Sequence, residues 1–297
     1  MSQDPLTLAQ SLESEAISFL AGPGNYNGHP NGVDRAFGEP IFGYAWAADP
    51  LWNSLKVAVD AECLSPLAAF LSLYPQGAQA QDLYVMVLVL PQTVKTIKEQ
   101  NKTTYWPGEG WARSRAAHDK AVHGLARHLQ SFLEAKGIEA VVPDLTPTWR
   151  TKPSSAYQIT SLWSHRHAGF MAGLGTFGLC DGLITKVGKA HRMTSLVVRN
   201  PLPVTPRSYA DHDFRRDCLW FNSGSCGLCV KRCPAGAITE SGHDKLKCSD
   251  FLKASTPYIE THWPDLKGAY ACGLCQSHVP CAVRTPKVLA KPQPQSV

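Results

Sequence analysis

The sequence predicts a mixed α and β domain followed by a smaller cysteine-rich module, and three observations lead to this class. Residues 83–90 (Leu-Tyr-Val-Met-Val-Leu-Val-Leu) are rich in β-branched side chains and apolar on both faces, as in a central strand covered on both sides. An amphipathic helix at residues 111–136 and a second strand at 138–142 follow, which indicates an α/β layer. Eight of the ten cysteines lie between Cys218 and Cys281.

Length and composition are those of a globular protein. With 297 residues, 44% hydrophobic and 18% charged, the chain can bury one large or two moderate cores. A net charge of +5 is compatible with an anionic cofactor or partner but supports nucleic acid only weakly. We expect an α/β domain at residues 1–210, the cysteine module at 211–285 and a flexible tail at 286–297.

Compartment and membrane association follow from the same composition. The longest apolar run, residues 83–90, is too short to span a bilayer, so no membrane contact is expected. The sequence shows no basic-then-apolar leader. We therefore expect a cytoplasmic protein, in which thiolates stay reduced and can hold metal.

Other elements of the first domain follow from periodicity and turn residues. In residues 6–20 apolar side chains recur every four positions, which predicts an amphipathic helix. Glycine, proline and asparagine dominate residues 25–40, which predicts an irregular loop. Residues 41–46 read as a short strand. Residues 63–73 read as a helix packed on the core, with Cys63 as a small buried hydrophobe.

The helix predicted at residues 111–136 carries apolar residues at intervals of four, from Ala117 to Leu133, and ends at Gly137. His118, His123 and His128 lie on it as well. Because most of the polar face of such a helix is solvated, we expect these histidines to face solvent and not a metal.

The cysteine spacing is typical of an iron–sulfur protein. Residues 226–234 read Cys-x2-Cys-x3-Cys-Pro, the tail of the bacterial ferredoxin run, whose first position falls on Ser223. We assign the missing thiolate to Cys218. The cysteine before proline ligates the other cluster in two-cluster proteins. The first cluster would then be held by Cys218, Cys226, Cys229 and Cys281, and the second by Cys233, Cys248, Cys272 and Cys275.

Two other chemistries compete for these cysteines. Zinc would use two Cys-x2-Cys pairs, but Cys229 and Cys272 are farther apart than in a zinc ribbon and four cysteines would be left over. Disulfide frameworks are typical of short secreted chains in oxidising compartments. Iron–sulfur ligation is the interpretation that uses all eight residues.

A glycine cluster at Gly173-x-Gly175-x-x-Gly178 formally matches a dinucleotide-binding fingerprint. That fingerprint follows a strand, whereas a helix-like segment precedes this one, and no Asp or Glu lies between Asp181 and Asp211. We therefore reject nucleotide binding. The glycines either let the backbone approach a ligand closely or make a tight turn from helix to strand.

These motifs together resemble a known family. Arg-His-Ala-Gly-Phe-Met-Ala-Gly-Leu-Gly-Thr-Phe-Gly at 166–178, Gly-Leu-Ile-Thr at 182–185 and the cysteine run at 226–238 look like the catalytic core shared by epoxyqueuosine reductase and the reductive dehalogenases. The likeness covers residues 40–285. It implies a nitroreductase-like, cobalamin-binding α/β domain fused to a ferredoxin-like module with two [4Fe-4S] clusters, which feed electrons to cobalt.

The resemblance also implies roles for individual residues. The epoxyqueuosine enzymes place a proton-donating aspartate ahead of the glycine run, but no carboxylate lies between Asp144 and Asp181 here. The dehalogenases use a tyrosine beside a basic residue, which Tyr157 with His165, Arg166 or His167 could reproduce. Cys180 is expected to be a buried thiol or a thiolate facing a cofactor. The residues expected at the corrinoid are His167, Gly173, Leu174, Gly175, Thr176, Phe177 and Gly178.

The predicted function is that of an oxidoreductase. Two clusters form an electron relay, the corrinoid carries the difficult chemistry, and the protein orients it and supplies a proton. We expect a small-molecule substrate and an external electron donor of the flavodoxin or ferredoxin type. Two alternatives are an electron-transfer protein that reduces a partner, such as a corrinoid protein, and a zinc-stabilised binding module.

Overall fold

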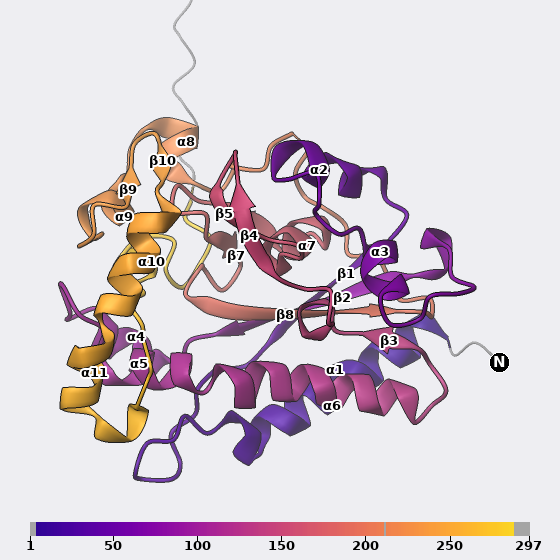
Figure 1. The fold of residues 1–297 in the computed structure, drawn as a ribbon, viewed down its shortest axis with the longest axis horizontal. Coiled ribbons are helices and arrows are strands. Elements are labelled where there is room, and N and C mark those ends of the chain that lie inside the picture. The colour runs from indigo at the N-terminus through magenta and orange to yellow at the C-terminus, as the bar shows by residue number, and fades with distance from the viewer. Residues whose placement is uncertain (1–3, 211, 288–297) are drawn as a thin grey trace, which may run out of the picture.

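A four-stranded antiparallel sheet forms the centre of the molecule in the computed structural model, which describes residues 4–210 and 212–287. The strand order is β1-β2-β8-β3, and Figure 1 shows the long strands side by side. Gly43 and Ser195 lie opposite Val87 on its two neighbours. The strands are β1 (Ile41–Trp46), β2 (Tyr84–Pro91), β3 (Ala140–Val141) and β8 (His191–Val198).

Both faces of this sheet are covered, as the sequence of β2 predicts. Met86, Leu88 and Leu90 enter one core together with α1 (Pro5–Ala21) and α6 (Gly124–Glu134). The alternate residues of β2 enter a second core with α3 (Pro66–Leu71) and α7 (His165–Met171). Figure 1 shows α1 and α6 below the sheet and α3 and α7 above it. The predicted mixed α and β class is confirmed.

The helix predicted at residues 111–136 is interrupted, so that prediction is wrong in one respect. Helix α5 (Glu109–Ala116) ends before a π-helical segment, η4 (Asp119–His123), and α6 begins at Gly124. The predicted apolar positions from Ala117 to Leu133 are all buried. Since hydrophobic periodicity reports burial and not hydrogen-bond register, it cannot show the wider turn.

Short elements complete the first part of the chain. There are two further β-hairpins, β4 (Thr151–Ser154) with β5 (Gln158–Ser161) and β6 (Gly175–Phe177) with β7 (Leu183–Thr185). The second packs against α7, and β5 of the first contacts the C-terminal segment 245–254. The other elements are η1 (Pro23–Asn25), η2 (Pro50–Asn53), α2 (Ser54–Ala58), η3 (Ala80–Asp82), α4 (Val94–Gln100) and η5 (Pro143–Leu145).

The cysteine-bearing part consists of short helices and one small hairpin. Its elements are α8 (Leu219–Ser223), α9 (Leu228–Lys231), β9 (Ile238–Thr239), β10 (Gly242–His243), α10 (Lys245–Ala254), α11 (Thr256–His262), η6 (Pro264–Leu266) and η7 (Leu274–Gln276). Figure 1 shows α10 and α11 rising beside α4 and α5.

An ion pair ties this part to the sheet domain. The buried guanidinium of Arg113 on α5 donates to both carboxylate oxygens of Asp265 in η6, at 2.6 and 3.1 Å. Such a bidentate pair fixes orientation as well as distance. The predicted domain boundary at residue 210 stays a prediction, and most of the predicted tail, from residue 288, lies outside the described residues. No helix in the described parts has the length and apolar character needed to cross a membrane.

Candidate functional site

The two Cys-Gly-Leu-Cys segments form tight turns that depend on glycine. Gly227 has φ +126° and Gly273 has φ +74°, a backbone region that disfavours side chains. At Gly273 a Cβ atom would stand 1.9 Å from the indole of Trp111 on α5. Each turn is followed by a helical segment, α9 or η7, and Arg232 after α9 donates to the carbonyl of Leu274 in η7 at 3.1 Å. The two cysteine pairs are therefore held side by side.

The cysteines fall into two groups that share Cys233. Cys218 and Cys229 are buried in an apolar cluster against which Cys233, Cys275 and Cys281 pack. Cys272 lies close enough to Cys233 and Cys248 for their charges to raise its pKa. Cys226 is half-buried, and Cys63 lies in the other half of the chain beside Asp60, as a buried thiol.

These thiols lie in an environment that disfavours free thiolates. Burial raises the pKa of Cys272 to about 12, and the neighbouring thiols Cys248 and Cys233 add to the effect. Burial likewise raises the pKa of Cys281. A backbone N–H at Ala237 donates to Cys233 Sγ at 3.3 Å, a contact that suits a charged sulfur. Bound metal would supply the positive charge that such thiolates need.

No three His, Cys, Asp or Glu side chains within residues 4–210 and 212–287 stand close enough together to hold a single metal ion. Structural zinc would need four ligands within about 2.3 Å of one centre. A four-iron cube spreads its four iron atoms, so its cysteines stand farther apart. The arrangement therefore gives the zinc alternative no ligand set among the described residues.

Cys180 lies among the cysteines of the module. From the sequence, it could have been either a buried thiol or a thiolate facing a cofactor. It is 5% exposed and packs in the same cluster as Cys218 and Cys229. Lys189 Nζ lies 3.0 Å from its sulfur. Contacts with Cys229 and with Cys275 lower the pKa of Cys180, and the ammonium of Lys189 acts in the same direction.

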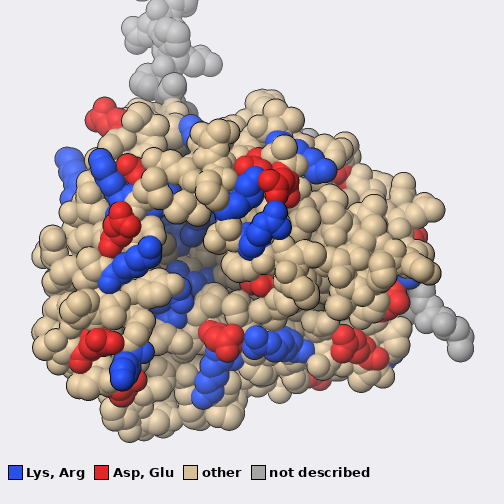
Figure 2. Space-filling model, in the orientation of Figure 1, with Lys and Arg blue, Asp and Glu red and all other residues tan. Residues whose placement is uncertain are grey.

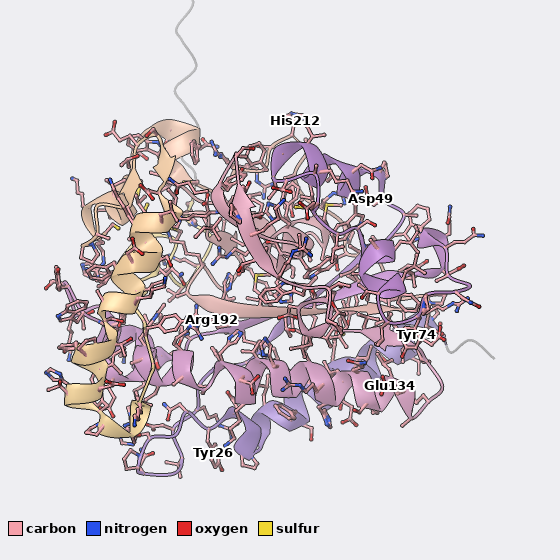
Figure 3. All side chains as sticks on the ribbon, viewed as in Figure 1. Tyr26, Asp49, Tyr74, Glu134, Arg192 and His212 are labelled. Atoms are coloured by element: carbon pink, nitrogen blue, oxygen red, sulfur yellow. The ribbon has the colours of Figure 1, made fainter. Side chains whose placement is uncertain are left out.

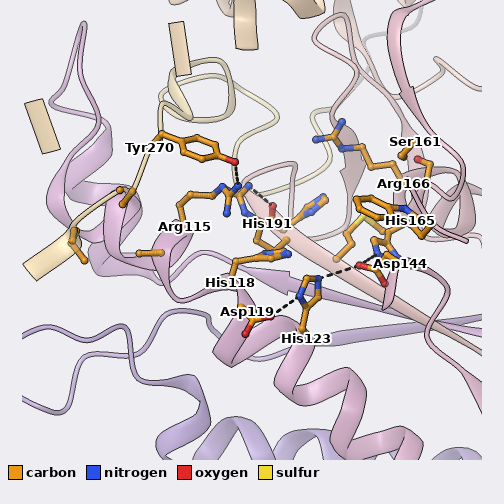
Figure 4. A pocket seen from close by; sticks show the side chains of 18 of the residues that line it. Arg115, His118, Asp119, His123, Asp144, Ser161, His165, Arg166, His191 and Tyr270 are labelled. Carbon is orange, nitrogen blue, oxygen red and sulfur yellow. Dashed lines mark hydrogen bonds and ion pairs between the residues drawn. The ribbon is translucent and has the colours of Figure 1, made fainter. Parts of the chain in front are cut away.

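A charged cavity of about 810 Å³ lies between the sheet domain and the η6 region. A chain of polar contacts runs along its wall, as Figure 4 shows for its first members: Asp119 Oδ1 is 3.0 Å from His123 Nδ1, His123 Nε2 is 3.2 Å from Asp144 Oδ2, and that oxygen is 3.0 Å from His165 Nε2. The far nitrogen of His165 contacts Ser195 Oγ at 2.8 Å. The expectation that His118 and His123 face solvent is therefore wrong, because the π-helical segment brings them to this cavity.

This chain holds the Asp144 carboxylate between two imidazoles inside the protein. Burial alone would raise the pKa of Asp144, but the hydrogen bond from His123 and the close imidazole of His165 outweigh it and lower the pKa far below its ordinary value. The same hydrogen bond to Asp144 raises the pKa of His123 in spite of burial. A carboxylate between two imidazoles can pass a proton along the wall.

Three arginines also face the charged cavity, and the sequence analysis singled out only one of them. Arg115, Arg166 and Arg192 have no carboxylate partner among the described residues, whereas the nearby Asp265 is taken by Arg113. Burial lowers the pKa of Arg192 to about 10, and repulsion from Arg115 and Arg166 adds to this. Figure 2 shows a hollow with Lys and Arg side chains inside it, and Figure 3 shows Arg192 in the middle of the molecule. Such a site favours an anion.

Buried nitrogens without partners face the same space. His118 Nδ1, His191 Nδ1 and Trp149 Nε1 have no hydrogen-bond partner in the described structure, and all three residues line the cavity. Burial lowers the pKa of His118 to about 3, with the charge of Arg192 acting in the same sense, so this imidazole is neutral. Unsatisfied buried groups are costly, so their presence in a cavity wall marks a place where a ligand or water completes the hydrogen bonding.

A second, apolar cavity of about 470 Å³ adjoins the first. Ser161, Ser164 and Arg166 line both cavities. Its walls include Leu55, Ile159, Phe170, Phe177 and Leu252, and Cys248 closes one side. The apolar cavity therefore connects a candidate cluster cysteine with the charged cavity.

The residues expected to be catalytic divide between the two cavities. Tyr157 and Arg166 line the apolar cavity, where Lys245 Nζ lies 4.4 Å from the centre of the Tyr157 ring. His165 faces the charged cavity with Arg166. Tyr157 is thus paired with Lys245, which the sequence analysis did not single out. The catalytic roles stay predictions.

Of the seven residues expected at the corrinoid, His167 and Phe177 line the apolar cavity, with ring centres 4.9 Å apart. Burial lowers the pKa of His167 to about 4, so this ring is neutral. Gly173, Leu174, Gly175, Thr176 and Gly178 line neither of the cavities described here.

Internal packing accounts for the glycines of this run. Gly173 has φ +70° at the end of α7, as in a helix C-cap. At Gly175 a Cβ atom would stand 2.0 Å from the carbonyl oxygen of Ile184 across the hairpin. Thr176 Oγ1 donates to Asp217 at 3.0 Å and so positions the loop that carries Cys218. The run is therefore a tight turn from helix to strand, and its contact with a corrinoid stays a prediction.

Sequence reasoning missed Asp144, Lys189, Arg115 and Arg192. Asp144 lies ahead of the interval in which a proton donor was sought, and only the fold brings it to His165. Lys189 and Arg192 carried one available signal: they are charged residues within and beside a run that otherwise reads as a buried strand.

The comparisons with known proteins agree on one relationship. No family model matches the chain. Over 170 residues it is 27% identical to epoxyqueuosine reductase of Bacillus anthracis, a match that covers 56% of this chain and 40% of that protein. The catabolic reductive dehalogenase NpRdhA has a TM-score of 0.51 at 16% identity, over 96% of this chain and 33% of its own. A reductive dehalogenase described with a mechanism for B12-dependent dehalogenation has a TM-score of 0.53 at 15% identity, with the same coverage.

This chain thus spans well under half of the curated relative and a third of these solved chains. The predicted resemblance to epoxyqueuosine reductase and the reductive dehalogenases is confirmed, in sequence for the first and in fold for the second.

Proposed function

We propose that this chain is an oxidoreductase in which two [4Fe-4S] clusters deliver electrons to a corrinoid that reduces a small anionic substrate. The proposal rests on one observation. Cys248 and Arg166 both line the apolar cavity, and Arg166 also lines the charged cavity. The candidate cluster cysteine, the space for the cofactor and the residues that would handle protons therefore adjoin one another.

The residues present fit iron–sulfur clusters. Seven of the eight predicted cysteines lie in two groups that share Cys233, and Cys226 stands in the same turn as Cys229, so the number matches what two cubes require. Lys189 and Arg232 lie near them as cations, and Arg232 is close enough for Cys272 and Cys275 to influence its pKa. Such charges offset the negative charge of a buried cluster.

The apolar cavity fits one face of a corrinoid ring. Phe170, Phe177 and Leu252 offer apolar area, while Arg215 and Lys245 at its margin suit the polar substituents and phosphate of such a cofactor. The cavity alone is small for so large a molecule, and the charged cavity, which shares Ser161, Ser164 and Arg166 with it, would supply the remaining space. A bound, reduced corrinoid supplies a strongly reducing cobalt centre for removing a substituent or an oxygen from carbon.

The chain's own residues would bind and protonate the substrate. Arg115, Arg166 and Arg192 attract its negative group and orient it. The imidazole of His165 is oriented by Asp144 at Nε2 and by Ser195 at Nδ1, so it would exchange a proton with His123 along this chain, while Tyr157 beside Lys245 is the candidate donor to the substrate. An external donor of the flavodoxin or ferredoxin type would reduce the clusters, and a cytoplasmic location would keep the thiolates reduced.

The relatives suggest two substrate classes. The curated relative is an epoxyqueuosine reductase, and one solved relative is linked with B12-dependent dehalogenation. Both are reductions, and an arginine-lined cavity of this size accepts a small carboxylate or phenolate.

The proposal is tested by anaerobic reconstitution with iron, sulfide and cobalamin. We expect about eight iron atoms and one cobalt per chain, with cobalt reduced when the clusters are reduced. A correctly folded protein that takes up iron but neither retains nor reduces cobalamin would support the electron-transfer alternative instead. A protein that binds zinc and no iron would contradict both.

The matched variants are Phe177→Arg, which places a charge in the apolar cavity, and Phe132→Arg, which alters a half-buried phenylalanine on α6 outside either cavity. Only the first should lose cobalt while it keeps iron, because its charge enters the space assigned to the ring.

A further inference from the structure

Cys180 occupies a rigid position at the tip of the β6–β7 hairpin. The turn is closed by the Gly178 N–H, which donates to the carbonyl of Gly182 at 2.9 Å, and Asp181 takes a positive φ of 57°. This turn directs the Cys180 side chain inward, where its sulfur meets Cys229 and Cys275. A thiol from the sheet domain therefore lies among the candidate cluster ligands.

Lys189 places a buried positive charge beside the Cys180 sulfur. It is only 2% exposed, and its ammonium lies 3.0 Å from Cys180 Sγ. Its backbone N–H donates to the carbonyl of Cys281 at 2.9 Å, and a Cβ at the preceding Gly188 would stand 2.2 Å from the carbonyl oxygen of Ala282. A buried ammonium without a carboxylate is costly unless an anion accompanies it, and thiolate sulfur is the anion within reach.

The ferredoxin run of this chain lacks a cysteine at its first position. Its first position is Ser223, whose hydroxyl donates to the carbonyl of Leu219 at 3.0 Å and contacts Ser225 Oγ at 2.7 Å. That side chain is engaged within its own segment. The sequence offered Cys218 as the substitute, and it is buried in the same cluster near Cys281. Unlike Cys180, it has no ammonium or guanidinium within hydrogen-bond distance of its sulfur among the described residues.

We propose that Cys180 is a ligand of the iron–sulfur cluster that Cys229 and Cys281 help to hold, and that Lys189 neutralises its thiolate. The inference rests on the proposed function, because it presumes that the clusters form. On binding, the Cys180 thiol releases its proton to solvent and its sulfur donates an electron pair to one iron, with no change in oxidation state. Nine thiols then compete for eight positions, and Cys218 is the one left outside.

Two matched variants, Cys180→Ser and Cys218→Ser, test this assignment after anaerobic reconstitution. We expect Cys180→Ser to fall from about eight iron atoms per chain to about four and to lose one cluster signal in electron paramagnetic resonance, while Cys218→Ser keeps both. Full iron in Cys180→Ser, or loss confined to Cys218→Ser, would overturn the proposal. Far-ultraviolet circular dichroism of the iron-free variants checks that both are folded.

Lys189→Met provides a readout that does not depend on losing a ligand. Removing a positive charge beside a cluster favours its oxidised form, so we expect the midpoint potential of one cluster to become more negative. Lys186→Met, an exposed lysine on the same loop, should leave both potentials unchanged. Equal potentials in Lys189→Met and wild type would contradict the role assigned to Lys189.

The iron content of the wild-type protein distinguishes a failure of the proposed function from a failure of the Cys180 assignment alone. Wild-type protein that is folded but free of iron would sink the proposed function itself. Wild-type protein with both clusters, together with an unaffected Cys180→Ser, would sink only the ligand assignment.

Discussion

The cysteine module and the charged cavity are built from the sequence in different ways. The eight predicted ligands lie within residues 218–281, and two of their pairs sit in identical Cys-Gly-Leu-Cys turns. The charged cavity draws its side chains from separate segments spread over residues 115 to 270. Local spacing therefore specifies the first site, while the path of the whole chain specifies the second.

The largest effect should come from breaking the local site. Cys272→Ser removes one of four sulfurs from a cube, and we expect iron to fall from about eight to about four atoms per chain. Iron analysis of anaerobically reconstituted protein measures this. Cys63→Ser, at the other buried thiol that the sequence set apart, is the control and should keep full iron. Equal iron in the two variants would show that Cys272 holds no cluster.

The next effect tests whether the turn itself is necessary. Gly273→Ala combines a left-handed backbone with a methyl group 1.9 Å from Trp111, and we expect it to destabilise the protein by about 3 kcal/mol or more. Gly268→Ala has the same φ of +74° with no atom within 4 Å, so it should cost only about 1 kcal/mol. Thermal or denaturant unfolding gives both values, and equal losses would refute the role of Trp111.

A smaller effect of opposite sign is expected in the charged cavity. Arg192→Gln relieves repulsion from Arg115 and Arg166, so the ligand-free protein should become more stable by about 1 kcal/mol. Added inorganic phosphate should stabilise wild type more than the variant, because the three guanidiniums together attract the anion. Arg284→Gln, an exposed arginine that lines neither cavity, should alter neither measurement. Destabilisation of Arg192→Gln without ligand would contradict an anion site.

The smallest effect is a pH dependence. The pKa of His123 is raised in the folded protein by Asp144, so its contribution to stability is present below the unfolded value of about 6.5 and is lost as pH rises through the folded pKa. We expect the stability gap between wild type and His123→Gln to shrink from pH 6 upward. The pKa of Asp144 is lowered in the folded protein, so its contribution to stability is lost as the pH falls, and only at acidic pH.

Chemical denaturation at several pH values measures this gap. His128→Gln, an exposed histidine on α6, controls for the loss of an imidazole. A gap that is constant with pH would show that the contact between His123 and Asp144 carries no charge.

Sequence patterns predicted much of the fold and part of the site. The buried faces of α1 and α6, the two covered faces of β2 and the rejection of a nucleotide fingerprint all followed from spacing. The π-helical segment did not, and with it the inward histidines were missed, because the spacing of apolar residues does not show where the hydrogen-bond register changes. The Tyr157 pairing with Lys245 was missed since a crossing of two distant segments leaves no local signal.

The sequence by itself determined that eight sulfurs would gather in the last third of the chain, because turn geometry and cysteine intervals are local properties of a few residues. Only the tertiary structure decided that Asp144 meets His165, that three arginines share one cavity and that Cys180 and Lys189 reach the cysteine module. These contacts join segments far apart in the chain, and their distances depend on how the helices and hairpins pack on the sheet.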